Sequence, residues 1–94
     1  MMMSRQRAEL IGLWAVAWLA QEDELFQVFM GSTGANEADI RASVQNVEFQ
    51  AAVLDFLLMD DAWITAFCQA HELEADTALM ARAALPGGQQ MHWT

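Results

Sequence analysis

The chain carries FQAAVLDFLLMDDAWITAFCQA at residues 49–70. Most of these residues are apolar, and one acidic step, Asp60-Asp61, divides them into two segments. Apolar residues recur in each segment at intervals of three and four, which is typical of helices that bury most of their surface. The stretch therefore predicts two core helices, of which the first is expected to be the central helix of the fold, and it contains no catalytic motif.

Helices are predicted along the rest of the chain as well. Ser4, Asn36 and Asn46 each precede an apolar run, and their short polar side chains suit the position before the first turn of a helix. The first helix is expected over residues 5–21. A second begins at the acidic residues 22–24 and is expected to end at Gly31, because glycine commonly terminates helices.

The sixth helix is predicted over about residues 75–84. Its expected anchors in the core are Leu79, Met80 and Ala83. Pro86-Gly87-Gly88 follows and is expected to end the helix, because proline and glycine do not continue one.

We predict an all-α fold, a single small domain of five to six helices in an orthogonal or irregular bundle. The second and third helices are too short for a regular four-helix arrangement, and no strand pattern or internal repeat is visible. The expected domain covers residues 1–88, followed by a flexible C-terminal tail over 89–94.

Composition narrows the classes of function. The 94 residues include 13 acids and four arginines, for a net charge of -9. Such a charge repels nucleic-acid phosphates and anionic lipid, so we expect neither a nucleic-acid nor a membrane partner. Such a charge is explained by the solubility that a small protein needs, and the alternative explanation is a basic protein partner. The single cysteine, Cys68, excludes an intramolecular disulfide and favours a cytoplasmic location.

The N-terminal region resembles a secretory signal at first sight. Arg5 and Arg7 precede an apolar run at residues 10–20. Glu9 places an acid in what would be the positive region, and the helical pattern continues past any cleavage point. The run is also too short to span a bilayer, so we expect a globular helix.

That first helix has two apolar faces. One is a stripe of larger residues, Leu10, Leu13, Trp14, Ala17 and Trp18. The other, nearly opposite, is Gly12, Ala15, Val16 and Leu19. A helix that is apolar on all sides is either central in its own fold or covered by a second chain. We therefore consider two alternatives for the second face, burial within the chain or a self-association face that would make a homodimer.

An ordered set of motifs resembles a known family. These are Phe29-Met30, Thr33-Gly34, Asp39-Ile40-Arg41, Val53–Leu58, Asp60-Asp61, Ala66-Phe67-Cys68 and Ala81–Gly88. Together they are similar to a family of short alphaproteobacterial proteins classified only as a domain of unknown function. The resemblance implies a small cytosolic helical protein and carries no catalytic residue. It also implies a helix-ending glycine where this chain has Glu72.

Candidate chemistry is sparse. Cys68 and His71 are spaced to share one helix face, but two ligands do not close a metal site. Asp60 and Asp61 are explained by helix capping. Asp55 lies inside the most apolar helix and is the one carboxylate that suggests a function, unless Arg41 or Arg82 pairs with it. We assign no catalytic, cofactor-binding or metal-binding residue.

These observations favour a non-catalytic protein-protein interaction or accessory module that binds an unidentified protein partner, for which a basic protein is one candidate. The alternative is a helical binding module for a small apolar ligand or lipid, held by aromatic and methionine side chains. An enzyme would have to rely on Asp55, Cys68 and His71 alone, and we expect the protein not to be one.

Overall fold

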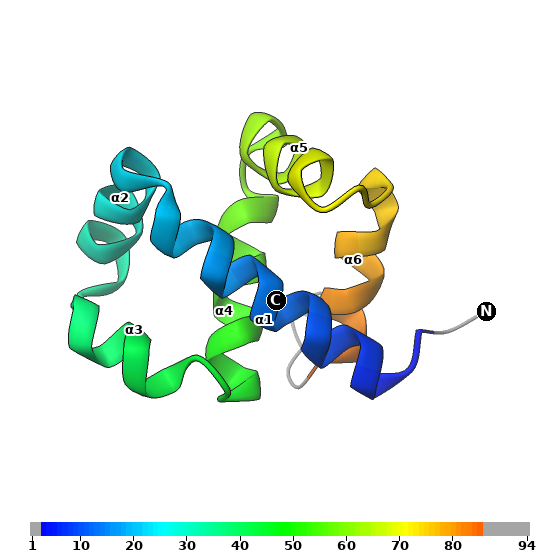
Figure 1. Cartoon of the computed structure of the whole chain (residues 1–94), viewed down its shortest axis with the longest axis horizontal. Helices are drawn as coiled ribbons and strands as arrows, with labels where there is room; N and C mark the ends of the chain where they lie inside the picture. The colour runs from blue at the N-terminus through cyan, green and yellow to red at the C-terminus, as the bar shows by residue number, and fades with distance from the viewer. Residues whose placement is uncertain (1–2, 86–94) are drawn as a thin grey trace, which may run out of the picture.

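A computed structural model describes residues 3–85, and in this range it contains six helices and no strand (Figure 1). The helices are α1 (Arg5–Gln21), α2 (Asp23–Thr33), α3 (Glu37–Ser43), α4 (Val47–Leu58), α5 (Asp61–Ala70) and α6 (Ala75–Ala84). The all-α prediction is confirmed. The segments at 86–88 and 89–94, predicted as a helix stop and a flexible tail, lie outside the described residues.

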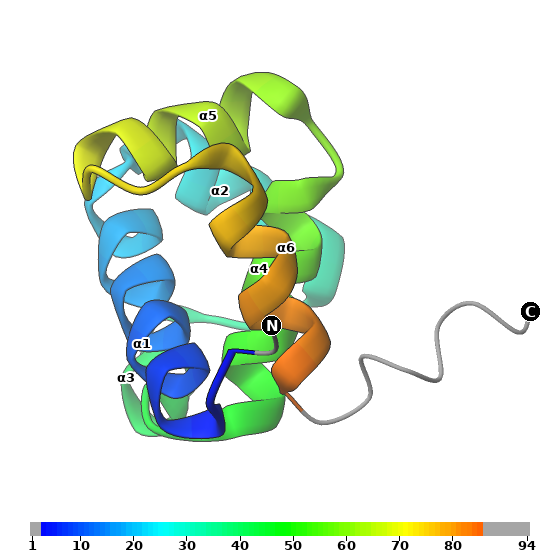
Figure 2. The same cartoon turned by 90° about the vertical axis from the view of Figure 1, so that its right-hand side faces the viewer.

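Helices α1 and α4 form the centre of the molecule. α1 lies against α4 and α6, and α4 also contacts α5 and α6. Figure 2 shows α1 and α6 side by side, with α5 crossing one end of the bundle and α3 at the other. The central position predicted for α4 is confirmed, since Val53, Leu54 and Leu57 are fully buried. Within residues 3–85, every helix is too short or too polar to span a lipid bilayer.

Polar side chains start four of the helices. Ser4 Oγ accepts a hydrogen bond from the Arg7 amide at the start of α1. Asn36 forms a reciprocal capping box with Asp39 at α3, and Asn46 and Asp60 cap α4 and α5. Each cap satisfies backbone donors that have no partner within the helix, which confirms the local predictions.

The predicted end of α2 is wrong. The helix continues through Gly31 to Thr33 and ends at Gly34, which has a φ of 79°. Gly34 donates its amide hydrogen to the Met30 carbonyl. The left-handed conformation that such an end requires decides which glycine stops the helix, and Gly34 adopts it.

The smaller face of α1 is the buried one. Leu10 is 41% exposed, whereas Ala15 is fully buried. The reason is a close approach of α4, since a Cβ atom added at Gly12 would lie 2.8 Å from the Cβ of Gln50. Gln50 Nε2 donates to the Val44 carbonyl, while its Oε1 is buried without a hydrogen-bond partner among the described residues.

Helix α6 also buries its small face, which corrects a second prediction. Leu79 and Met80 are 60% and 40% exposed, and Ala83 is exposed too. Ala78 and Ala81 are fully buried instead, because their short side chains let α6 lie close to α1. The expected anchors therefore form the outer face of this helix.

Helix α5 ends at an unusual residue. Glu72 has a φ of 56°, in the left-handed region. Its amide donates to the Gln69 carbonyl, and the Leu73 amide donates to the Cys68 carbonyl at 2.8 Å. This pair of hydrogen bonds is a Schellman motif, in which glycine usually occupies the position of Glu72. The chain has the glycine-type ending that the family resemblance implies, without the glycine.

Candidate functional site

Asp55 is part of an ion pair between helices. Arg82 Nε on α6 donates to Asp55 Oδ1 on α4 at 2.6 Å. The Arg82 side chain is 11% exposed and that of Asp55 is 35% exposed. Of the two partners predicted for Asp55, Arg82 is the one observed, whereas Arg41 lies 3.8 Å from Glu37 on α3. The pair holds α4 and α6 together, which gives Asp55 a structural role.

Cys68 and His71 are held in separate packing environments. Cys68 is buried, and this burial raises the pKa of its thiol, a shift that a hydrogen bond with the Ala78 backbone partly opposes. The His71 ring stacks on Trp14 at 5.3 Å, with the two planes 7° apart. Within residues 3–85, no three His, Cys, Asp or Glu side chains are grouped as metal ligands would be.

The proposed self-association face lies in the core of the chain. Gly12, Ala15, Val16 and Leu19 are all buried, and Val16 is 2% exposed. Their neighbours include α4 and α6 of the same chain. This corrects the alternative in which the four residues form an exposed dimer face. The close approach allowed by Gly12 is made by α4 rather than by a second copy.

A groove opens where α1 ends, α2 begins and α5 crosses them. Its volume is about 510 Å³, within the range of about 300–1,000 Å³ that ligand pockets occupy. We call it the acidic groove. It is lined by Trp18, Gln21, Glu22, Asp23, Glu24, Leu25, Val28, Ala62, Trp63 and Ala66.

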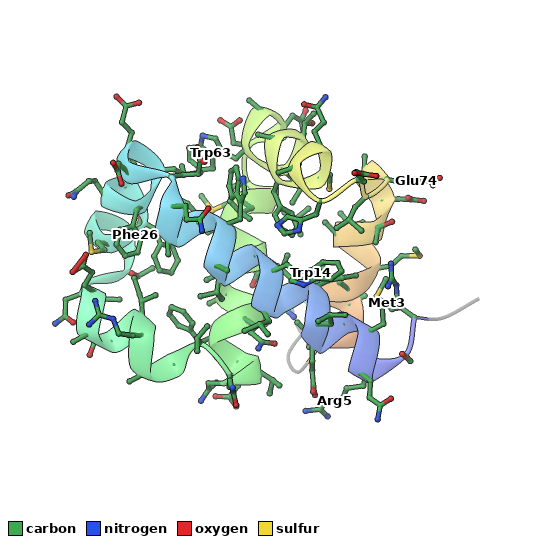
Figure 3. All side chains as sticks on the ribbon, in the orientation of Figure 1. Met3, Arg5, Trp14, Phe26, Trp63 and Glu74 are labelled. Atoms are coloured by element: carbon green, nitrogen blue, oxygen red, sulfur yellow. The ribbon has the colours of Figure 1, made fainter. Side chains whose placement is uncertain are left out.

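Two tryptophans give the acidic groove a rigid apolar wall. The Trp18 ring contacts Phe67 edge-on at 5.9 Å, and the Trp63 ring stacks on Phe56 at 4.8 Å. Each tryptophan is held by a buried phenylalanine behind it but remains partly exposed. Figure 3 shows Trp63 between the start of α2 and α5. Val28 extends this apolar surface and is 48% exposed.

Three acids form the rim of the same groove. Glu22 is the single residue between α1 and α2, and its amide donates to the Leu19 carbonyl. Asp23 and Glu24 follow in the first turn of α2, where the helix dipole stabilises negative charge. All three side chains are exposed. None of the residues that line the groove is basic, so the charged side chains in its lining are all negative.

A second, smaller space lies on the other side of α2. We call it the apolar hollow, and its volume is about 300 Å³. It is lined by Val16, Ala17, Ala20, Phe26, Glu37, Ile40, Arg41 and Val44. Glu37 and Arg41 are the charged residues of this lining, and a guanidinium nitrogen of Arg41 lies 3.8 Å from Glu37 Oε1.

Sequence reasoning found the components of the acidic groove but did not assemble them. The acids at 22–24 are predicted to start a helix, and Trp18 belongs to the larger apolar stripe of the first helix. The acids at 23 and 24 do lie in the first turn of α2, and the rings of Trp18 and Trp63 pack on phenylalanines. The available signal was an acidic run directly after an aromatic helix end, which becomes a groove only when α5 is placed beside it.

The chain matches the sequence profile of a known family. The sequence profile of a family described as a protein of unknown function (DUF3572) covers residues 5–88, most of the chain. No curated protein and no solved structure matches. The matched range contains the six described helices, the acidic groove and the apolar hollow. The chain therefore belongs to the DUF3572 family.

Proposed function

We propose that this chain is a non-catalytic interaction protein whose acidic groove binds a basic, amphipathic helical segment of another protein. One observation carries the proposal. A single groove combines two partly exposed tryptophans with three exposed carboxylates. An amphipathic helix would place apolar side chains on the wall and its arginines or lysines against the rim.

The apolar wall supplies the affinity in this proposal. Tryptophans are common anchors in interfaces because they bury a large area with little loss of side-chain freedom. Trp18 and Trp63 are already fixed by the phenylalanines behind them, so a partner does not have to order them. Val28 and Leu25 continue the wall along α2, which suits apolar residues repeated along a helix.

The acidic rim supplies the choice of partner. Glu22, Asp23 and Glu24 attract a basic segment and oppose an acidic one, and the whole chain has a net charge of -9. The same charge accelerates association with a cationic partner at low ionic strength. An acidic or neutral partner would make the apolar contacts with the wall but no favourable charge interaction with the rim, so the groove favours a basic partner.

We propose a non-catalytic function because the three candidate reactive residues have other roles. Asp55 is paired with Arg82, Cys68 is buried with a raised thiol pKa, and His71 is stacked on Trp14. None of the three is among the residues that line the acidic groove. The groove offers shape and charge, which are the properties of a binding surface.

A synthetic peptide tests the proposal directly. The probe is an amphipathic helix with leucine on one face and arginine on the other, and its control carries glutamate in place of arginine. Calorimetric titration is expected to show binding of the arginine peptide only, with affinity that falls as salt is added. The charge-removing variant Glu22→Gln/Asp23→Asn/Glu24→Gln is expected to bind about tenfold more weakly.

A matched variant separates the groove from the overall charge. Glu72→Gln/Glu74→Gln/Asp76→Asn removes the same three charges from the connection between α5 and α6 and from the start of α6, outside the groove lining. It is expected to retain nearly full affinity. Equal weakening by the two triple variants would mean that the peptide responds to net charge alone, and the proposal would fail. Circular dichroism confirms that each variant is folded.

A further inference from the structure

The apolar hollow between α1, α2 and α3 is distinct from the acidic groove. Three of its lining residues, Val16, Phe26 and Ile40, are apolar and at most 7% exposed. Ala17, Ala20, Glu37 and Arg41 are exposed, so the hollow opens to solvent. An apolar molecule that enters it removes apolar surface from water, which favours binding.

The hollow exists because two small residues of α1 face it. Ala17 and Ala20 lie on the exposed side of α1 and line the hollow. Neither side chain is long enough to fill the distance to α3, so Ile40 and Val44 cover the space without closing it. Phe26 on α2, which is labelled in Figure 3, lines the third side of the hollow.

Helix α3 is held loosely over the hollow. Of its seven residues, all of them described, Ile40 alone is buried. Its C-terminal end is tied to α4 by the hydrogen bond from Gln50 Nε2 to the Val44 carbonyl at 3.0 Å. A short helix with one buried anchor shifts at low cost in free energy, which lets the open hollow adapt to a ligand.

The chemistry of the lining narrows the ligand. Val16, Ile40 and Val44 offer aliphatic surface, and Phe26 is the one aromatic residue among those that line the space. Glu37 and Arg41 at the rim are paired, so their charges largely cancel. The net charge of -9 opposes an anionic head group. These features together favour an aliphatic chain that ends in an uncharged polar group.

We infer that the apolar hollow binds a medium-length aliphatic chain with an uncharged head, of which a fatty alcohol is the simplest example. The inference is independent of the function proposed for the acidic groove. Helices α1 and α2 contribute residues to both spaces, but no residue lines both. Each site can therefore fail or hold by itself.

Titration with 1-octanol, followed by NMR of methyl groups, tests the inference. Saturable shifts are expected at the methyl groups of Val16, Ile40 and Val44. The variant Ala20→Leu fills the hollow from an exposed position, so it should remain folded and bind 1-octanol at least about tenfold more weakly. Octanoate is expected to bind more weakly than 1-octanol because of its charge.

A matched substitution in the other site is the control. Ala62→Leu places the same bulk at an exposed alanine of the acidic groove and is expected to leave 1-octanol binding unchanged. The inference is overturned if Ala20→Leu binds as well as the original chain, or if the shifted methyl groups are those of Leu25 and Val28. Tighter binding of octanoate than of 1-octanol would overturn the uncharged head.

Discussion

Two parts of this bundle are built differently. In the tight part, α1, α4 and α6 meet through small residues such as Gly12, Ala15, Ala78 and Ala81, and the helices lie close together. In the open part, α2, α3 and α5 surround the tight part and leave the acidic groove and the apolar hollow. Close packing gives stability, whereas incomplete packing leaves surface for a ligand or partner. The tight part therefore contributes most of the stability, and the open part holds both of the binding sites that we propose.

The largest expected effect is at a buried leucine of the tight part, and a leucine on the surface is its control. Leu57→Ala on α4 is expected to lower the free energy of unfolding by about 3–4 kcal/mol, because it leaves a cavity in the core. Leu79→Ala on α6 is expected to change it by less than about 0.5 kcal/mol, since Leu79 is 60% exposed. Urea denaturation measures both variants. Similar losses would mean that α6 buries Leu79 after all.

The same substitution at two glycines is expected to have opposite signs. Gly12→Ala should lower the free energy of unfolding by about 1–2 kcal/mol, because the new methyl group would meet Gln50 at 2.8 Å and overpack the contact. Gly31→Ala should raise it by about 0.5–1 kcal/mol, since Gly31 lies within α2 and a Cβ there has no neighbour within 4 Å.

Thermal and urea denaturation measure the change in unfolding free energy of the two glycine variants, one in the tight part and one in the open part. Any stabilisation by Gly12→Ala would contradict the close approach of α1 and α4. A loss of stability in Gly31→Ala would show that the open part is packed closely around Gly31, which would contradict the free space found there.

The smallest effect is expected at the corner between α5 and α6. Glu72→Gly should raise the free energy of unfolding by about 0.5–1 kcal/mol, because a left-handed conformation costs a residue with a Cβ more than it costs glycine. Glu72→Gln removes the charge but keeps the steric cost, so its stability should stay near that of the original chain. If the glutamine variant gains as much as the glycine variant, charge rather than conformation explains the change.

Much of this fold was predictable because it depends on near neighbours in sequence. Ser4, Asn36, Asn46 and Asp60 were identified as caps, since a cap needs only a polar side chain and the turn that follows. The central position of α4 followed from its nearly continuous apolar surface. Arg82 was one of two proposed partners of Asp55, because only four cations are present in the chain.

The buried faces of α1 and α6 could not be predicted in the same way. Both helices carry apolar residues on opposite sides. The sequence therefore left burial of the Gly12 face of α1 as one of two alternatives, and it favoured the larger residues of α6, such as Leu79, as core anchors. The small residues are inside because they let helix backbones approach closely, a gain that depends on the partner helix. The candidate site could not be predicted from the sequence for the same reason, since Trp18, Glu22 and Trp63 form one groove only where α5 crosses α1 and α2.

The sequence by itself determined where helices begin, that no strand is favoured, that the chain is strongly acidic and that α4 is central. The tertiary structure decided which face of each helix is inside, which glycine ends α2, and that two incompletely filled spaces flank α2. The division has a physical reason. Caps and periodicity arise from interactions within a turn or two of helix, whereas burial and grooves depend on the distance between segments far apart in the chain.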